Sequence, residues 1–174
     1  WILVFSILIA SIGLNVSSTA VVIGAMLISP LMGPILGIGF SISVNDMDML
    51  RKSLINLGIM VGLSLITSFL FFSVPIFQDA TPELIARTKP DVRDVLIAVA
   101  GGLALIVAIS RPKPLFNTVA GVAIATALMP PLCTVGVGIA MGRWDVAGGA
   151  FLLFITNAVT IAFAAMLLLN TIDV

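Results

Sequence analysis

The chain has 174 residues, of which 60% are hydrophobic and 9% are charged, and eight basic residues balance eight acidic ones. An ordinary soluble domain has about 45–50% apolar and about 25% charged residues, so this composition excludes a soluble globular domain and a disordered chain. A nucleic-acid binder would show a basic excess. The sequence has no His and one Cys, which excludes a His-based triad, a His-ligated metal site and an intrachain disulfide. We therefore expect an all-α polytopic membrane protein.

Long uncharged stretches set the predicted elements, and the first of them covers residues 1–45. A helix needs about 20 apolar residues to cross a bilayer, so this stretch is long enough for two crossings with a break at residues 12–18, where Gly, Asn and Ser favour a turn and a helix cap. The stretches do not alternate as β-barrel strands do. The sequence predicts six transmembrane spans, at residues 1–14, 17–43, 53–77, 92–110, 117–142 and 146–170.

The longest predicted connection covers residues 78–93 and contains Thr81, Pro82 and Glu83 in succession. A Thr N-cap, a Pro at the first helical position and an acid in the first turn predict a short interfacial helix here. Asp91 and Asp94 are expected to cap the fourth span. The connection divides the chain into a first three-span unit, residues 1–77, and a second one, residues 94–174.

An internal repeat is visible when the chain is aligned with itself at a shift of 101 positions. Apolar identities are frequent by chance, so the rarer residue types carry the argument. These identities are Pro30 with Pro131, Gly37 with Gly138, and Asn56 with Asn157. Spans two and five are three crossings apart and therefore run in opposite directions. The sequence predicts a 3+3 inverted repeat in which the second and fifth spans are broken.

Prolines cause the predicted breaks. Pro30, Pro130 and Pro131 lack an N–H, and each ring clashes with the carbonyl four residues earlier. The carbonyls freed in this way are those of Met26, Thr126 and Ala127. In hydrocarbon such groups need partners in protein or water, so the breaks must face the bundle interior or an aqueous cavity. A packing kink is the alternative for either break, but two matched breaks favour a substrate or ion site.

Polar side chains within the spans complete the candidate site. We expect the substrate- or ion-binding residues to be Asn15, Ser17, Met26, Ser29, Pro30, Asn56, Asn117, Thr126, Ala127, Pro130, Pro131 and Asn157. For the two span-interior asparagines, Asn56 and Asn157, an interhelical hydrogen bond is an equal alternative. No carboxylate, Lys or Arg is central to a predicted span, and no Ser has an evident base. We therefore expect no enzyme activity, no metal and no cofactor.

Two segments carry a family resemblance. The sequence NVSSTAVVIGAMLISPLMGPI at residues 15–35 resembles the first signature of a bacterial and archaeal membrane family, domain of unknown function 389, and ALMPPL at residues 127–132 resembles its second. The resemblance covers essentially the whole chain. It implies an integral membrane protein, often with a soluble N-terminal domain ahead of the membrane part, and no particular activity. Since the chain starts at Trp1, we expect it to be part of a longer protein.

The leading functional hypothesis is a channel or secondary transporter for a small ion or polar solute, with its site where the two broken helices cross. Freed carbonyls would suit a cation or a neutral solute, whereas half-helix N-termini would suit an anion. The alternative is a non-transporting anchor, assembly or signalling module for a soluble domain, with a dry interior. We expect a multi-pass inner-membrane protein with both termini on one side, the cytoplasmic one by a slight loop-charge difference. Its expected partners are the lipid bilayer and, through small-residue helix contacts, further copies of itself, but no nucleic acid.

Overall fold

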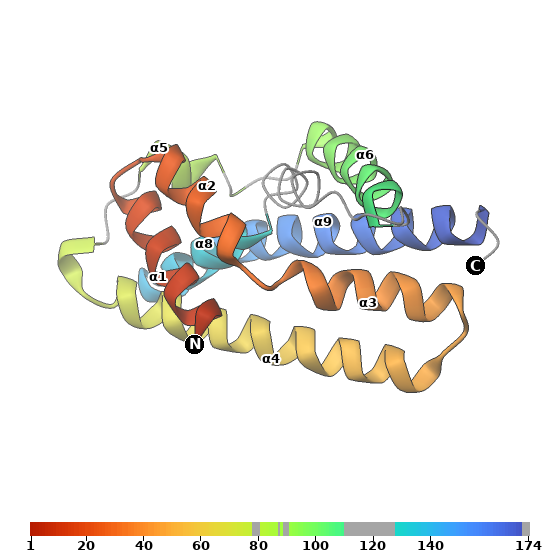
Figure 1. The fold of residues 1–174 in the computed structure, drawn as a ribbon. Coiled ribbons are helices and arrows are strands. Elements are labelled where there is room, and N and C mark those ends of the chain that lie inside the picture. The colour runs from red at the N-terminus through yellow and green to blue at the C-terminus, as the bar shows by residue number, and fades with distance from the viewer. Residues whose placement is uncertain (78–80, 87, 89–90, 110–127, 172–174) are drawn as a thin grey trace.

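The computed structural model describes residues 1–77, 81–86, 88, 91–109 and 128–171. Regular structure within these residues is entirely helical, which confirms the all-helical class (Figure 1). In chain order the helices are α1 (Ile2–Asn15), α2 (Thr19–Ile28), α3 (Met32–Ser43), α4 (Met47–Phe72), the 3-10 turn η1 (Pro75–Phe77), α5 (Pro82–Ile85), α6 (Val92–Ile109), α8 (Met129–Ala140) and α9 (Trp144–Thr171).

Two long helices, α4 and α9, frame the molecule, and two half-length helices lie between them (Figure 1). Both α3 and α8 pack against α4 and against α9, α3 toward one end of the bundle and α8 toward the other. α1 packs on α2, α4 and α8, and α6 packs on α9. Residues Met129 to Gly138 of α8 are all buried, so this short helix forms the centre of the described core.

Membrane-spanning length is reached by fewer helices than the sequence predicts. Among the described residues, α4 and α9 are long and apolar enough to cross a bilayer, and α2 with α3 would make a third span although they are bent by 52°. α1 has 14 residues and α8 has 12. At 1.5 Å per residue these helices are about 21 and about 18 Å long, less than the about 30 Å of hydrocarbon. These helices are consistent with a membrane protein, and the six-span arrangement stays a prediction.

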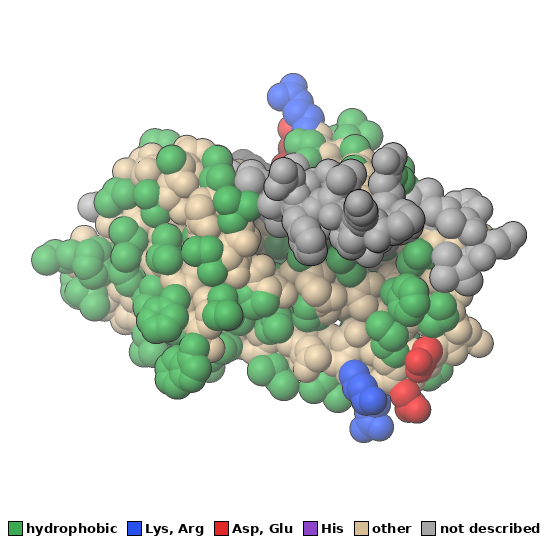
Figure 2. Space-filling view, viewed as in Figure 1, with side chains coloured by type: hydrophobic (Ala, Val, Ile, Leu, Met, Phe, Trp, Pro, Cys, Tyr) green, Lys and Arg blue, Asp and Glu red, His purple; other side chains and the backbone are tan. Residues whose placement is uncertain are grey.

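The outer surface supports this assignment. Figure 2 shows patches of hydrophobic side chains spread across the described part of the face in view, while charged side chains gather over the starts of α4 and α6. On α4, Ile59, Ile66 and Leu70 are each about three-fifths exposed. A surface this apolar is typical of a protein in lipid rather than in water.

Helix caps follow the polar residues of the sequence. The Asp46 carboxylate accepts a hydrogen bond from the Met49 N–H at 2.9 Å, so α4 begins several residues before the predicted span at residue 53. The short helix predicted in the connection is confirmed as α5: Thr81 Oγ1 accepts from the Leu84 N–H at 3.4 Å. The same hydroxyl donates to the Leu14 carbonyl at 2.7 Å and so ties the connection to the end of α1.

The predicted break in the second span is present between α2 and α3. Ser29 leaves the helical conformation with φ −68° and ψ 130°. The Met26 carbonyl accepts from the Ser29 N–H, and the Pro30 carbonyl accepts from the Gly33 N–H, both at 3.3 Å. Residues 110–127, which hold the first part of the predicted fifth span, lie outside the described residues. Its second part is α8, whose first turn contains both consecutive prolines.

Candidate functional site

The break between α2 and α3 meets the start of α8 at one small gap. Its volume is about 10 Å³, and the residues that line it are Met26, Ser29, Leu31, Met32, Leu128 and Met129. The first four come from the break between α2 and α3, and the last two come from the start of α8. A volume of about 10–15 Å³ is needed for a single water, so the gap is closed to any larger solute in this conformation.

Helix ends give the gap its polarity. Both α3 and α8 start at it and run away from it in opposite directions (Figure 1). The helix dipole places a partial positive charge at each start. Free N–H groups add little to it, because Pro130 and Pro131 in the first turn of α8 have no N–H, and the Leu31 and Gly33 N–H groups already donate to Ser29 Oγ and the Pro30 carbonyl. The carbonyls of Met26 and Pro30 likewise already accept backbone N–H groups. Through their dipoles alone, the starts of the two half-length helices favour a negative charge at the gap over a cation.

Methionines close the gap. Met26, Met32 and Met129 are all buried, and each contributes to its lining. A methionine side chain is unbranched and flexible, so it fills irregular space and changes rotamer easily. An apolar constriction of this kind can exclude water without a rigid barrier. Among the described residues, Ser29 has the one polar side chain on the lining, and its Oγ accepts from the Leu31 N–H at 3.4 Å.

Some predicted site residues lie at or beside the gap. Met26 and Ser29 line it, and Pro30 lies directly between lining residues. Pro130 and Pro131 are buried immediately after Met129 in the first turn of α8. Three further predicted residues, Asn117, Thr126 and Ala127, lie outside the described residues.

The remaining predicted residues are elsewhere. Asn15 ends α1, and its Nδ2 donates to the Phe77 carbonyl at 2.9 Å. Ser17 is exposed in the turn before α2 with φ 52°. Asn56 is exposed on α4, whereas Asn157 is buried in α9. The two asparagines therefore have different environments, and neither lines the gap between the broken helices.

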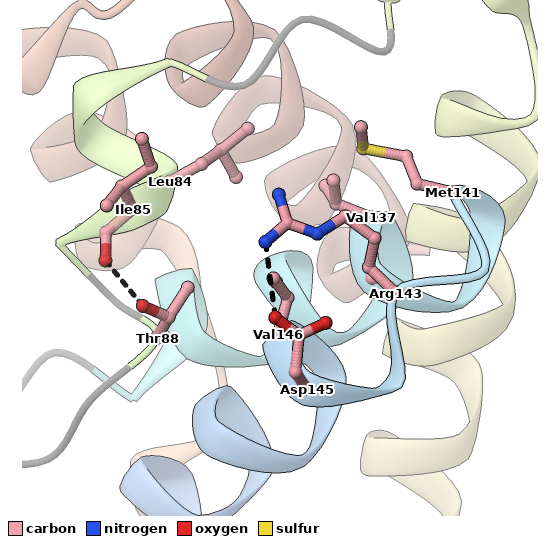
Figure 3. Close-up of a pocket in the computed structure, with 9 residues that line it drawn as sticks. Leu84, Ile85, Thr88, Val137, Met141, Arg143, Asp145 and Val146 are labelled. Carbon is pink, nitrogen blue, oxygen red and sulfur yellow. Dashed lines mark hydrogen bonds and ion pairs between the residues drawn. The ribbon is translucent and has the colours of Figure 1, made fainter.

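A second and larger cavity lies at the end of α8 away from the gap. Its volume is about 370 Å³, and its lining is formed by Leu84, Ile85, Thr88, Val137, Gly138, Met141, Arg143, Asp145 and Val146. The Arg143 guanidinium extends into the space between α5 and the end of α8 (Figure 3). Its Nη2 donates to Asp145 Oδ2 at 3.2 Å, and the two side chains are 50% and 71% exposed.

The comparisons with known proteins now have a structural context. The sequence model of the family described as "Domain of unknown function (DUF389)" matches residues 26–163, which is well over half of the chain. The chain belongs to the DUF389 family. The matched range includes both the gap and the larger cavity, so both lie within the part that carries the family's pattern.

One curated relative of this DUF389 chain is "Uncharacterized protein MJ0678" of Methanocaldococcus jannaschii, which is 28% identical over 169 residues. That match covers 97% of this chain and 52% of the relative. The chain thus spans about half the length of the relative. No solved structure matches this DUF389 chain. Neither the family description nor the relative's name gives an activity, so function must be argued from the geometry.

Sequence reasoning missed the larger cavity of the DUF389 chain. Its walls come from the connection and from the corner between α8 and α9, which are far apart in the sequence. One local signal was present, the pair Gly148 and Gly149 in the first turns of α9. The Thr88 backbone carbonyl lies directly against Gly149, whereas nothing lies within 4 Å of a Cβ built on Gly148. A glycine there indicates close approach of another segment, but not which one.

Proposed function

We propose that this DUF389 chain forms a channel or secondary transporter for a small ion or polar solute, with its site where α3 and α8 begin. The observation that carries the proposal is that two half-length helices start at one gap between α4 and α9 and run outward in opposite directions. Broken helices are tolerated within a membrane where they are buried in protein or line a water-filled cavity. Discontinuous helices that meet at the midplane are typical of transporter sites.

The solute's charge follows from the helix ends. The dipoles of two helices that start at one point favour an anion, or the negative end of a dipolar solute. Two carbonyls at the α2–α3 break, those of Met26 and Pro30, each already accept one hydrogen bond, which makes them weaker ligands for a cation. A small anion is therefore the first solute class to test.

Matching helix bounds support the inverted repeat that the proposal includes. α3 and α8 each have 12 residues. Met32 and Met129, which begin them, are 97 positions apart, as are Met47 and Trp144, which begin α4 and α9. This spacing differs from the shift of 101 found by sequence identity, and it pairs Pro131 with Pro34 instead of Pro30. Apolar sequences give chance identities at several shifts, so helix bounds are the better guide to register.

The two corners after these helices repeat the same hydrogen bonds. In the first, the Asp46 N–H donates to the Ser41 carbonyl at 2.9 Å, and in the second, the Arg143 N–H donates to the Gly138 carbonyl at 2.7 Å. Both acceptors and both donors are 97 positions apart. Left-handed residues also occupy the same place in each corner, Asn45 with φ 55° and Gly142 with φ 67°.

Packing between the halves follows the same spacing. Gly39 of α3 lies against Ala165 of α9, and Gly136 of α8 lies against Ser68 of α4. The glycines are 97 positions apart, and so are Ala165 and Ser68. Each half-length helix thus uses a glycine to approach the long helix of the other half, which is the arrangement expected of two halves related by a pseudo-two-fold axis.

A non-transporting membrane module is the second candidate. The small volume of the gap favours it, because a dry and fully packed interior is what an anchor or assembly module needs. The chain also spans only about half of its archaeal relative, so a soluble domain beside it fits this candidate as well. For both candidate functions, we propose that the protein inserts in the inner membrane and forms a homo-oligomer.

Two measurements separate the candidates: the flux of ions through the reconstituted protein, and the accessibility of position 29 to a thiol reagent. The protein is reconstituted in vesicles, and the flux of chloride, nitrate, formate and bicarbonate is compared with that of sodium and potassium. Ser29→Cys is then treated with a charged, membrane-impermeant thiol reagent. Ser6→Cys, buried in α1 away from the gap, is the control, and the parent chain with its buried Cys133 gives the background.

The transport proposal expects saturable anion flux that stops when Ser29→Cys is modified, with no modification of Ser6→Cys. Cation flux without anion flux would leave transport standing but contradict the charge argument. Absence of any flux, together with an unreactive Ser29→Cys, would overturn the transport proposal in favour of the module.

A further inference from the structure

We propose that the cavity enclosed by α5, Thr88, the end of α8 and the start of α9 binds an amphiphilic anion, with the acid group on Arg143 and the apolar body against the cavity walls. The inference concerns binding alone and does not depend on the proposed transport. The cavity is separate from the gap: Met129 and Val137 are eight residues apart on α8, which corresponds to about 12 Å.

The walls suit hydrocarbon. Leu84, Val137 and Val146 lie on three different elements and supply aliphatic surface, and Met141 adds a flexible thioether. A volume of about 370 Å³ is within the range of about 300–1,000 Å³ found for small-molecule sites. Such sites have mostly apolar walls with a few placed polar groups. Among the described residues, the polar side chains on the lining are those of Arg143, Asp145 and Thr88.

Arg143 is held where an acid group can reach it. The left-handed Gly142 turns the chain sharply after α8, and the Arg143 N–H donates to the Gly138 carbonyl at 2.7 Å. The side chain then extends into the cavity rather than away from it (Figure 3). A guanidinium has five N–H donors in a fork that fits a carboxylate or phosphate, and the bond to Asp145 uses one of them.

The Thr88 hydroxyl already donates a hydrogen bond within the protein, so it is not free to donate to a ligand. Thr88 Oγ1 donates to the Ile85 carbonyl at 2.7 Å (Figure 3). It therefore does not serve as the main donor for the ligand. The charge on Arg143 is the feature that selects the ligand.

Asp145 determines how strongly an anion binds. Its carboxylate is the group that now pairs with Arg143, so an incoming acid must share the guanidinium with it and is repelled by it. Removing the charge of Asp145 should consequently tighten anion binding, while removing that of Arg143 should weaken it. A cationic ligand would show the opposite pair of effects, so the two variants report the sign of the ligand.

The experiment uses the protein in phosphatidylcholine nanodiscs and titrates octanoate, with empty nanodiscs as the background for partition into lipid. Octylammonium and octanol, which carry the same chain, test the need for negative charge. The variants are Arg143→Gln and Asp145→Asn. Arg93→Gln is the control, because Arg93 is also an exposed arginine paired with an aspartate, at 3.7 Å from Asp91, but is not among the residues that line this cavity.

We expect saturable octanoate binding to the parent chain. The affinity should be at least about tenfold weaker in Arg143→Gln, which corresponds to about 1.4 kcal/mol. It should be about threefold or more tighter in Asp145→Asn and unchanged in Arg93→Gln. Octanol and octylammonium should bind more weakly than octanoate. Arg143→Lys keeps the charge but loses the fork, so an intermediate affinity supports the proposal if Arg143→Gln does not fold. Equal affinity in Arg143→Gln and the parent chain, tighter binding of octylammonium, or no saturable binding would overturn the proposal.

The natural ligand could be a free organic acid or the acidic headgroup of a lipid. Repeating the titration in nanodiscs that contain phosphatidylglycerol separates these sources. A loss of octanoate affinity there, absent in Arg143→Gln, identifies the acidic lipid as the occupant. Unchanged affinity identifies a soluble amphiphilic acid.

Discussion

Single glycines decide how closely the helices of this protein approach one another. A Cβ built on Gly39 would lie 2.6 Å from the Ala162 carbonyl oxygen and 2.9 Å from Ala165 Cβ, both on α9. Backbone atoms of a packed helix cannot give way as a flexible side chain can. At Gly58, in the middle of α4, a Cβ meets nothing within 4 Å. The same residue type therefore has a packing role at one site and none at the other within the described structure.

Alanine substitution should separate these two glycines. We expect Gly39→Ala to destabilise the fold by about 1–3 kcal/mol, because the added methyl overpacks the α3–α9 contact. Gly58→Ala should be neutral or stabilise by up to about 1 kcal/mol, since Ala is the better residue in a helix interior. Thermal unfolding in mild detergent measures both. Equal tolerance of the two substitutions would contradict the close α3–α9 contact.

The starts and breaks of helices could be predicted from the sequence where they depend on residues only a few positions apart. Pro30 with Ser29 predicted the break between α2 and α3, and Thr81 with Pro82 predicted α5. Cap and proline effects act within a few residues, so they can be read without knowing the fold. The predicted start of α4 was less accurate. The span was placed at residue 53, after the charged residue Lys52, whereas the helix begins at Met47, directly after its Asp46 cap.

Tertiary features were harder to predict. The larger cavity brings Leu84 next to Val137 and Arg143, and no local rule relates residues that far apart in the sequence. The candidate site at the gap was found only in part, since Met26 and Ser29 line it while Asn15 bonds to Phe77 instead. Polar residues near a span end can serve a turn or a site equally well, and only packing decides between them.

The connection between the halves offers a test at this scale. Gly149→Ala should push the Thr88 carbonyl away from α9 and loosen the segment around α5. Gly148→Ala, one residue earlier, meets nothing within 4 Å and is the matched control. We expect faster amide hydrogen exchange at residues 82–88 in Gly149→Ala only. If amide hydrogen exchange at these residues is faster in both variants, or in neither, the connection does not depend on this contact.

For the whole molecule, the decisive feature is a pair of half-length helices whose starts face each other across a methionine-lined gap. The gap holds about 10 Å³, while the cavity at the far end of α8 holds about 370 Å³. Between these two sites of the described structure, the larger space therefore lies at the far end of α8. A transporter closed at its centre has this form, and so does a packed module with one binding pocket.

Shortening one methionine tests whether the gap is a gate. Met129→Ala removes most of a side chain that is 1% exposed and should cost about 2–5 kcal/mol of stability. If transport occurs, it should also raise the basal flux of a confirmed permeant, because the apolar constriction widens. Met47→Ala, at an exposed position at the start of α4, is the control and should leave flux unchanged. A folded Met129→Ala protein with unchanged flux would contradict the gate.

The contact between α3 and α9 has a consequence for biosynthesis. Gly39 packs on Ala165, which the ribosome adds 126 residues later (Gly39 to Ala165). At about 5–20 residues per second, that interval is about 6–25 s. During it, α3 and the break before it lack the helix that will cover them. If the chain inserts into a bilayer as it is made, the insertion machinery or the lipid itself must shelter a bent, glycine-bearing helix until α9 emerges.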